Sequence, residues 1–284
     1  MKYLLTLLFL ASIGSIQAQN ILKFDKRNVQ CEDKWVAYKM NKDSLYSFGF
    51  IYIDATAGLT LNYEGNFKID KAGKFNRIKQ DSIREVGFMK VRLEPNRVAI
   101  AEIPESKFTE LEIEKTPKWL AIYKSDENSI DHLYRWGFLY NGWNECEKAL
   151  TYLEKAEKID PNFKGLQTEL AFSYNALKKY ESAEICLLKA IKNNPNDCYT
   201  YKELAYSYNH QGKTADVIKT YFTMVKTCKE ENYIQETAYN LAFKYYETKD
   251  KVNFKKWKME AEKWSKTENQ FTKYLKLMET ELNK

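Results

Sequence analysis

The chain has 284 residues, with 45 basic and 39 acidic side chains and a formal net charge of +6. So mild a balance shows no electrostatic footprint of a nucleic-acid-binding protein, and the length allows one large domain or two smaller ones. The five cysteines form no C-x-x-C pair and only two histidines are present, so the composition argues against a metal site. We expect no cofactor.

The amino-terminal residues predict a secretory signal peptide. Lys2 precedes an almost wholly apolar run over residues 3–16, and Ala18 supplies a small side chain at a cleavage point. The run is too short to span a bilayer, although an amino-terminal membrane anchor is the alternative interpretation, and no later segment is apolar enough to span one. We therefore expect residues 1–18 to be removed and the mature protein to be exported, to the periplasm, the cell surface or the exterior.

Residues 20–124 predict a small antiparallel β domain. Short runs rich in aromatic and β-branched residues are separated by turn signals: WVAYKM, YSFGFIYID, GLTLNYEG, VGFMKVRL and RVAIAEI. The segment RLEPNRVAI predicts a hairpin that turns at residues 94–96, and Ala72 and Gly73 predict a second turn. We expect six to eight strands in one sheet or a sandwich, with a short helix within residues 104–114. We recognise no family in this half.

After a polar linker at residues 125–129, which also suits the capping of a helix, the chain repeats itself with a step of 34 residues. Pro161 and Pro195 lie one step apart. Small residues at two fixed positions let two antiparallel helices approach closely, an aromatic ring fills the gap between them, and proline ends the second helix. The other aligned sets are Trp136, Leu170 and Leu204; Gly137, Ala171 and Ala205; Tyr140, Tyr174 and Tyr208; Ala149, Ala183 and Val217; and Ala156, Ala190 and Met224.

This pattern resembles the tetratricopeptide repeat family over about residues 130–265. The resemblance implies an array of helical hairpins, with a degenerate fourth unit that fits after an insertion of three residues. The three units in common register are residues 130–163, 164–197 and 198–231. A solitary helix at 268–283 is expected to cover the end of the array. We therefore predict an α+β protein of two domains, in which the antiparallel β domain precedes an all-α solenoid at 130–284 with a carboxy-terminal capping helix.

The first helices of the units carry more aromatic residues than their packing needs. These lie on a stripe next to the packing stripe, because residues three or four apart share one face of a helix. Asparagines recur on it at steps of 34, and their amides can both donate to and accept from a peptide backbone. In the resembling family this face is the concave groove that binds peptides or extended partner segments. The predicted groove residues are Tyr134, Phe138, Asn141, Phe172, Asn175, Tyr199, Lys202, Tyr206, Asn209, His210, Tyr239, Phe243 and Tyr246.

The alternative interpretation of this stripe is structural. Asparagine is favoured near helix ends by turn formation, and the rings can be buried by the β domain or by the next repeat. If the stripe is a groove, Lys202 is its only lysine or arginine. The groove then lacks the basic set that resembling chaperone-binding repeats use to clamp a terminal carboxylate, so we expect a neutral or aromatic-rich ligand.

Two of the cysteines are predicted to meet in the third unit. Cys198 opens its first helix and Cys228 closes its second, so an antiparallel hairpin brings both to the same end. In the oxidising compartment that the leader implies, they are expected to form a disulfide, the alternative being two free thiols.

No motif for nucleotide binding, zinc proteolysis or hydrolase chemistry occurs in the chain, so no enzymatic activity is expected. The predicted function is that of an exported scaffold or adaptor that binds a protein or peptide partner through the concave groove, within an envelope-associated complex. The alternative is an envelope enzyme or carbohydrate-binding protein with its site in the β-rich domain, in which the repeats serve assembly.

Overall fold

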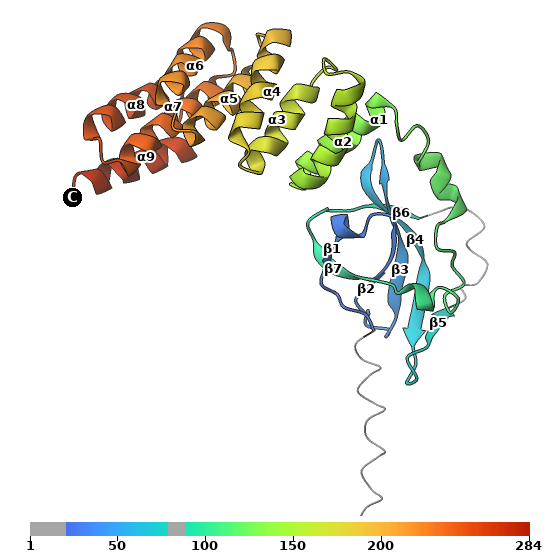
Figure 1. The fold of residues 1–284 in the computed structure, drawn as a ribbon. Coiled ribbons are helices and arrows are strands. Elements are labelled where there is room, and N and C mark those ends of the chain that lie inside the picture. Colours follow the sequence, from blue (N-terminus) through green and yellow to red (C-terminus); the bar gives the residue numbers. More distant parts are fainter. Residues whose placement is uncertain (1–20, 79–88) are drawn as a thin grey trace, which may run out of the picture. The chain divides into compact units, whose positions relative to one another are not determined.

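The computed structural model describes residues 21–78 and 89–284. It divides into two compact units, residues 1–127 and 128–284, which are described separately below (Figure 1). The predicted signal peptide lies outside the described residues.

The described part of the first unit is built on an antiparallel sheet of seven strands, as predicted. Its order is β1-β7-β2-β3-β4-β5, and β6 also pairs with β4. The strands are β1 (Lys26–Arg27), β2 (Lys34–Tyr38), β3 (Tyr46–Asp54), β4 (Gly58–Ile69), β5 (Phe75–Ile78), β6 (Lys90–Arg92) and β7 (Val98–Glu102). The predicted runs thus become strands, while residues 86–88 of the fourth run lie outside the described part.

The turn predicted at Ala72 and Gly73 joins β4 to β5. The Asp70 carboxylate accepts hydrogen bonds from the backbone N–H groups of Ala72 (2.9 Å) and Lys74 (3.0 Å). Gly73 has φ +78°, a left-handed conformation that glycine adopts without steric cost. Local chemistry thus favours this turn, and Lys107 adds a hydrogen bond to the Gly73 carbonyl (2.8 Å).

The prediction of a hairpin around residues 94–96 is wrong, because the two strands that flank the turn do not pair with each other. A turn is present, with the N–H of Arg97 donating to the Glu94 carbonyl, yet β6 pairs with β4 whereas β7 pairs with β1 and β2. The reason is that other residues use the backbone of the turn. Asn28 donates from its side chain to the Glu94 carbonyl (2.8 Å), and the N–H of Val29 donates to Pro95 (3.0 Å), which directs the chain to the β1 side.

The core of the first unit is rich in aromatic rings. Trp35, Phe48 and Phe67 are buried with an edge-on contact between the two phenylalanines. Residues 104–114 form only a 3₁₀ turn (Glu105–Lys107) followed by irregular turns, rather than a regular helix. A further 3₁₀ helix, Lys118–Tyr123, packs two more rings on the Tyr52 ring. The rings of this half thus largely stabilise its interior.

The second unit consists of consecutive helices that form hairpins (Figure 1). They are α1 (Ile130–Gly142), α2 (Cys146–Ile159), α3 (Leu166–Ala176), α4 (Tyr180–Asn193), α5 (Cys198–His210), α6 (Thr214–Thr227), α7 (Glu231–Glu247), α8 (Lys251–Lys263) and α9 (Gln270–Leu282). Ser129 of the linker caps α1 by accepting a hydrogen bond from the N–H of His132 (3.2 Å). None of the described helices is long and apolar enough to cross a membrane.

The helix boundaries follow the sequence period. The second helices α2, α4 and α6 begin 34 residues apart, and α8 begins 37 residues after α6. The three-residue insertion expected before the fourth unit is taken up in α7, which has 17 residues where α5 has 13. Within a hairpin the small residues permit close approach, since a Cβ built on Gly137 lies 2.4 Å from the Leu153 side chain.

The first helices form the inner side of a curved array. Each of α1, α3, α5 and α7 packs against the next first helix along the chain. Among the described helices no comparable contact joins α2 to α4 or α4 to α6, so the second helices are more widely spaced. The row of first helices is therefore the concave side of this unit.

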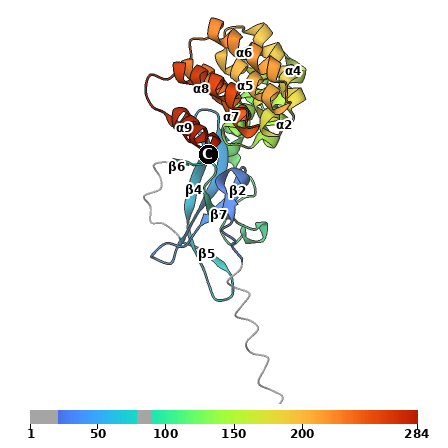
Figure 2. The same cartoon turned by 90° about the vertical axis from the view of Figure 1, so that its left-hand side faces the viewer.

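The last helix, α9, acts as the predicted cap. It lies beside α7 (Figures 1 and 2), and Leu275 continues the buried leucine series of Leu170, Leu204 and Leu241. One residue further on, Lys276 stands where α5 and α7 place a buried alanine, and it pairs with Glu268 at 2.7 Å. A charged side chain at this position lets the outer face of α9 meet water, so the array ends here.

Candidate partner-binding groove

One aromatic side chain from each unit stands at the same repeat position on the concave side. We call Phe138, Phe172, Tyr206 and Phe243 the aromatic stripe; they are separated by 34, 34 and 37 residues. Each lies two residues after the buried Trp or Leu of its helix, a rotation of about 200° that turns it away from the hairpin core. Phe138, Tyr206 and Phe243 are 43%, 38% and 38% exposed, and Phe172 is half-buried. Leu277 of α9 continues the position and is also exposed.

A small hollow of about 160 Å³ opens between the first two members of the stripe. It spans three first helices and is lined by Phe138, Asn141, Gly142, Glu169, Phe172 and Tyr199. Aromatic walls and a carboxylate thus converge at one point of the groove.

The remaining predicted rings pack along the edges of the stripe. Tyr134 contacts the Phe163 ring, with centroids 5.2 Å apart, and Tyr239 contacts the ring of Phe271 on α9 at 4.9 Å. Tyr246 donates its hydroxyl hydrogen to Glu281. These three side chains are half-buried and therefore support the groove more than they present surface to it.

His210 belongs to a cluster that the sequence showed only in part. Its imidazole stacks on the ring of Tyr180, with centroids 4.8 Å apart, and lies 4.4 Å from that of Tyr206. Burial lowers the pKa of His210, and the charge of Lys178 adds to this shift. Tyr180 was not among the predicted groove residues, because it begins the second helix α4 and the predicted stripe lies on first helices.

The structure corrects the predicted role of the asparagines in binding a peptide backbone. Asn141 and Asn175 are almost fully buried, at 4% and 3% exposure. Asn141 donates to the main-chain carbonyl and the carboxylate of Glu169 (both 2.9 Å) and accepts from the Ser173 hydroxyl (2.6 Å). Asn175 repeats these bonds with residues 203 and 207. These hydrogen bonds join each unit to the next, and we call each set an inter-unit clamp. Because the amides are fully engaged in the clamps, they do not bind a ligand.

Asn209 breaks this series at the degenerate unit. The counterparts of the glutamate and the serine, 37 residues on, are Asn240 and Lys244. The side-chain oxygen of Asn209 is buried and has no hydrogen-bond partner within the described residues. The clamp thus ends where the repeat loses its register.

The helical hairpins, their 34-residue step and the inter-unit clamps are those of a repeat protein, and residues 186–219 match the tetratricopeptide repeat family. The second unit contains a tetratricopeptide-like segment. The matched residues run from within α4 through α5 into α6. No curated protein matches the chain, and the β-rich half has no recognised family.

The tetratricopeptide-like groove also contains carboxylates that were not among the predicted groove residues. Glu169 and Glu203 lie one 34-residue step apart, and Glu236 follows on α7. Lys202 lies 2.5 Å from a carboxylate oxygen of Glu203 and 3.9 Å from one of Glu236. Burial raises the pKa of Glu169, and the charge of Glu203 raises it further, against a hydrogen bond from Asn141. Their recurrence at 34 residues is the sequence signal for this pair, but carboxylates are too common in this chain for it to stand out.

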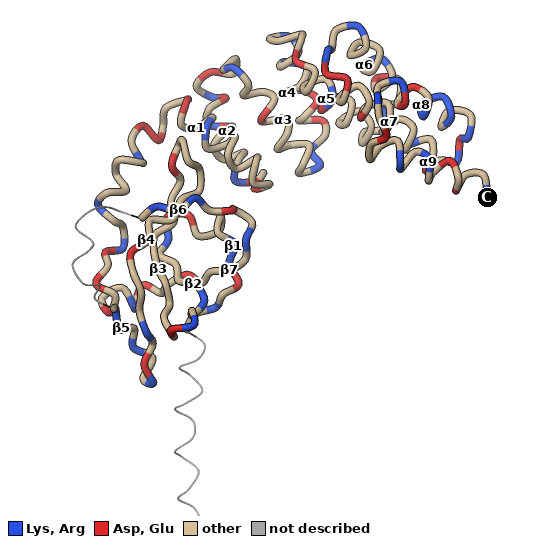
Figure 3. The backbone as a smooth tube through the Cα atoms, turned by 180° about the vertical axis from the view of Figure 1, so that it is seen from behind, with Lys and Arg blue, Asp and Glu red and all other residues tan. Residues whose placement is uncertain are grey.

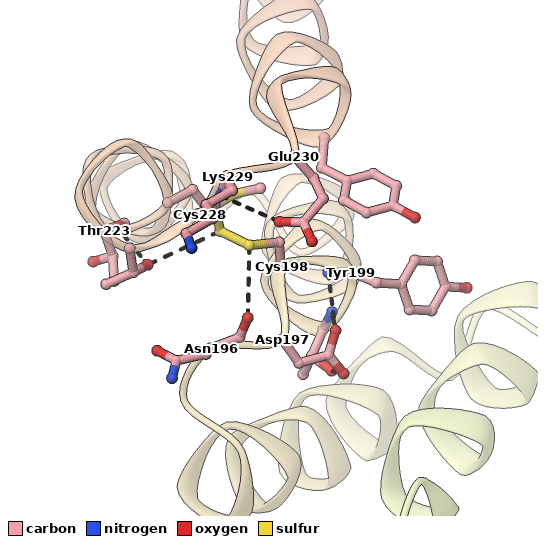
Figure 4. Close-up of a disulfide and its surroundings, with 12 residues drawn as sticks. Asn196, Asp197, Cys198, Tyr199, Thr223, Cys228, Lys229 and Glu230 are labelled. Atoms are coloured by element: carbon pink, nitrogen blue, oxygen red, sulfur yellow. Dashed lines mark hydrogen bonds between the residues drawn. A yellow bond between two sulfur atoms is a disulfide. The ribbon is translucent and has the colours of Figure 1, made fainter.

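A disulfide joins Cys198 and Cys228, the pair expected from the hairpin topology, with Cα atoms 5.5 Å apart (Figure 4). It links the start of α5 to the residue after α6. Beside it, the Asp197 carboxylate caps α5 by accepting from the N–H of Tyr199 at 3.1 Å. The other three cysteines, Cys31, Cys146 and Cys186, are buried free thiols.

Residues 249–266 are rich in lysine and contain the helix α8. One edge of this helix packs its tryptophan against the array, and the opposite side meets solvent. Trp257 is buried, and the indole N–H of Trp264 donates to the Tyr221 hydroxyl (3.0 Å). Lys258 and Lys263 pair with glutamates of the same helix, and Figure 3 shows both signs of charge spread over the array.

In residues 21–78 and 89–284, no three potential ligand side chains gather as a metal site would require.

Proposed function

We propose that this protein is an exported, non-enzymatic scaffold or adaptor that holds a partner protein or peptide in the groove of its helical array. A tetratricopeptide-like repeat suggests a role in protein–protein interaction. Export rests on the apolar leader at residues 1–18. On the same two features we propose that it takes part in a larger envelope-associated assembly.

The observation that carries the proposal is the exposed aromatic stripe. Packing of the hairpins is already satisfied by buried residues such as Trp136, Leu170 and Leu204. The stripe residues are not needed for that packing. Because three of the four rings stay partly exposed, the fold lacks roughly 1–2 kcal/mol of hydrophobic stabilisation at each of them. Apolar side chains recurring along one face mark an interaction surface.

A row of rings, one from each unit, suits an extended or helical segment of a partner. Such a ligand can present apolar side chains at intervals along its length and so contact several units at once. Large aromatic side chains also dominate binding energy where a partner seals them from water.

A site in the β-rich unit gains no support from its aromatic residues. The rings of Trp35, Phe48 and Phe50 lie in the core of that unit. We therefore propose the adaptor function in preference to a site in the β-rich unit.

The proposal is tested by affinity capture from an envelope extract of the source organism. Bait proteins are the mature chain, a variant with all four stripe residues changed to serine, and a matched control. The control changes three exposed apolar residues of the second helices, Leu188, Phe222 and Met259, to serine. Capture of a partner by the wild type and the control, but not by the stripe variant, supports the proposal. Equal capture by all three baits contradicts it.

A further inference from the structure

Glu169 is a groove carboxylate without a cation. One of its oxygens accepts a hydrogen bond from the Asn141 amide at 2.9 Å. No lysine or arginine of the described residues lies within ion-pair distance of it. The carboxylate nevertheless lines the aromatic hollow, and burial keeps it from full hydration.

The next unit shows what completes such a site. There, Glu203 occupies the repeat position of Glu169, and its other carboxylate oxygen lies 2.5 Å from the ammonium group of Lys202. The same ammonium group lies 4.7 Å from the centroid of the Tyr199 ring. The equivalent of Lys202 in the second unit is Thr168, whose hydroxyl is 3.1 Å from that of Thr200. A short hydroxyl side chain thus replaces the cation.

We propose that the hollow at Glu169 receives a lysine or arginine side chain of the partner. This inference rests on the proposed groove function and names its ligand chemistry. The partner's cation pairs with Glu169 and contacts the rings of Phe138 and Phe172, much as Lys202 pairs with Glu203 and lies over the Tyr199 ring.

The charges of the groove fit this ligand. Glu169, Glu203 and Glu236 bring three carboxylates to the inner face, and only Lys202 is paired with them there. A guanidinium group already lies over one of these rings, since Arg135 is 5.7 Å from the centroid of Phe138. Aromatic faces attract cations, and the attraction grows as both are removed from water. The sequence predicted a neutral or aromatic-rich ligand, and the geometry favours an aromatic and basic one.

The test uses peptides as probes. The binding of acetylated and amidated Gly-Phe-Lys-Phe-Gly to the mature protein is compared with that of peptides in which Gln or Glu replaces the central Lys. A charged hydrogen bond in a partly buried site is expected to favour the Lys peptide over the Gln peptide about tenfold, with the Glu peptide weaker still. The Lys advantage is also expected to fall as salt is added.

Three variants separate this inference from a general loss of structure. Glu169→Gln removes the charge and keeps the acceptor for Asn141, so the Lys advantage should disappear. Thr168→Lys supplies an internal cation at the position that Lys202 holds in the next unit, and should also remove the advantage. Thr168→Val loses the same hydroxyl without adding charge and should retain it.

The possible outcomes distinguish the two proposals. If the Lys, Gln and Glu peptides bind equally and the stripe variant loses all three, the groove binds peptides and the cation inference is overturned. If Thr168→Lys keeps the full preference for Lys, the inference is likewise overturned. If no peptide binds up to millimolar concentration while the wild type still captures a partner through the aromatic stripe, the cation inference is overturned and the proposed function stands.

Discussion

Asn175 donates from its side-chain amide to both the main-chain carbonyl of Glu203 (3.2 Å) and its carboxylate (3.0 Å). The amide oxygen in turn accepts a hydrogen bond from Ser207, so one buried side chain ties α3 to α5 at three atoms. A clamp of this kind fixes how successive units stack, and hence the curvature of the face that carries the aromatic stripe.

Removing the clamp should destabilise the array. Asn175→Ala leaves the Ser207 hydroxyl and a Glu203 oxygen without this partner in a buried place, at a cost of about 2–4 kcal/mol in the free energy of unfolding. Asn209→Ala, at the same repeat position but without a partner for its oxygen, should cost less than about 1 kcal/mol. Urea denaturation followed by circular dichroism measures both. Equal losses for the two variants would mean that the hydrogen bonds of Asn175 contribute nothing specific.

The disulfide should contribute substantially to the stability of the helical unit. Its cysteines are 30 residues apart in sequence, and closing a loop of that size stabilises a protein by about 3–4 kcal/mol in the chain-entropy account. We expect a reducing agent to lower the free energy of unfolding of the wild type by that amount and to leave the Cys198→Ser, Cys228→Ser double variant unchanged. A wild type that unfolds identically with and without reductant would refute the expectation.

The buried thiols should be unreactive in the folded protein. Burial raises the pKa of Cys31 and of Cys186 to about 11 and also raises that of Cys146. At pH 8 a thiol with a pKa near 11 is ionised in about one molecule in a thousand, and the thiolate is the reactive form. Mass spectrometry after brief treatment with iodoacetamide should find these three thiols unmodified, and alkylated once the protein is unfolded. Rapid alkylation of the native protein at any of them would show that the side chain is accessible.

Glu169 should lower stability at neutral pH. Its pKa is higher in the folded protein than in the unfolded chain, so the folded state binds its proton more readily. The stability contributed by this proton is complete at low pH and is lost as the pH rises through the raised pKa. Glu169→Gln should therefore raise the melting temperature at pH 7, and the gain should shrink as the pH falls and vanish below the ordinary glutamate pKa of about 4.3, where the wild-type carboxyl is neutral in both states. A variant that melts below the wild type at pH 7 would contradict this sign.

Much of the helical unit could be predicted because its repeat encodes packing directly. The small residues, the tyrosines and the prolines recur where two helices must touch or end, and α2, α4 and α6 accordingly begin one period apart. The cysteine pair followed from the same hairpin topology. In the β-rich half, alternation predicted the strands but not their partners, since it specifies a face of the sheet and not a neighbour. The pairing of β6 and β7 depended on contacts with residues 28 and 29 that no local pattern reveals.

The candidate site was predicted less completely. Periodicity placed Phe138 and Asn141 on one side of α1, and the structure exposes the first and buries the second. The difference arises because the next unit covers one edge of that side, and a helical period cannot tell which edge this will be. The role proposed for Glu169 depends on its comparison with Glu203 in three dimensions, because the 34-residue recurrence alone does not show which glutamate is paired.

The most direct test of the groove is site-specific photocrosslinking. A benzoylphenylalanine placed at Tyr206, on the aromatic stripe, reports contacts of the inner face, and the same group at Phe222, which is exposed on the second helix of the same unit, reports the outer face. We expect irradiation in an envelope extract to join a partner protein to the Tyr206 position and not to the Phe222 position. Crosslinks formed only from Phe222 would contradict the account, because the partner would then bind the convex side.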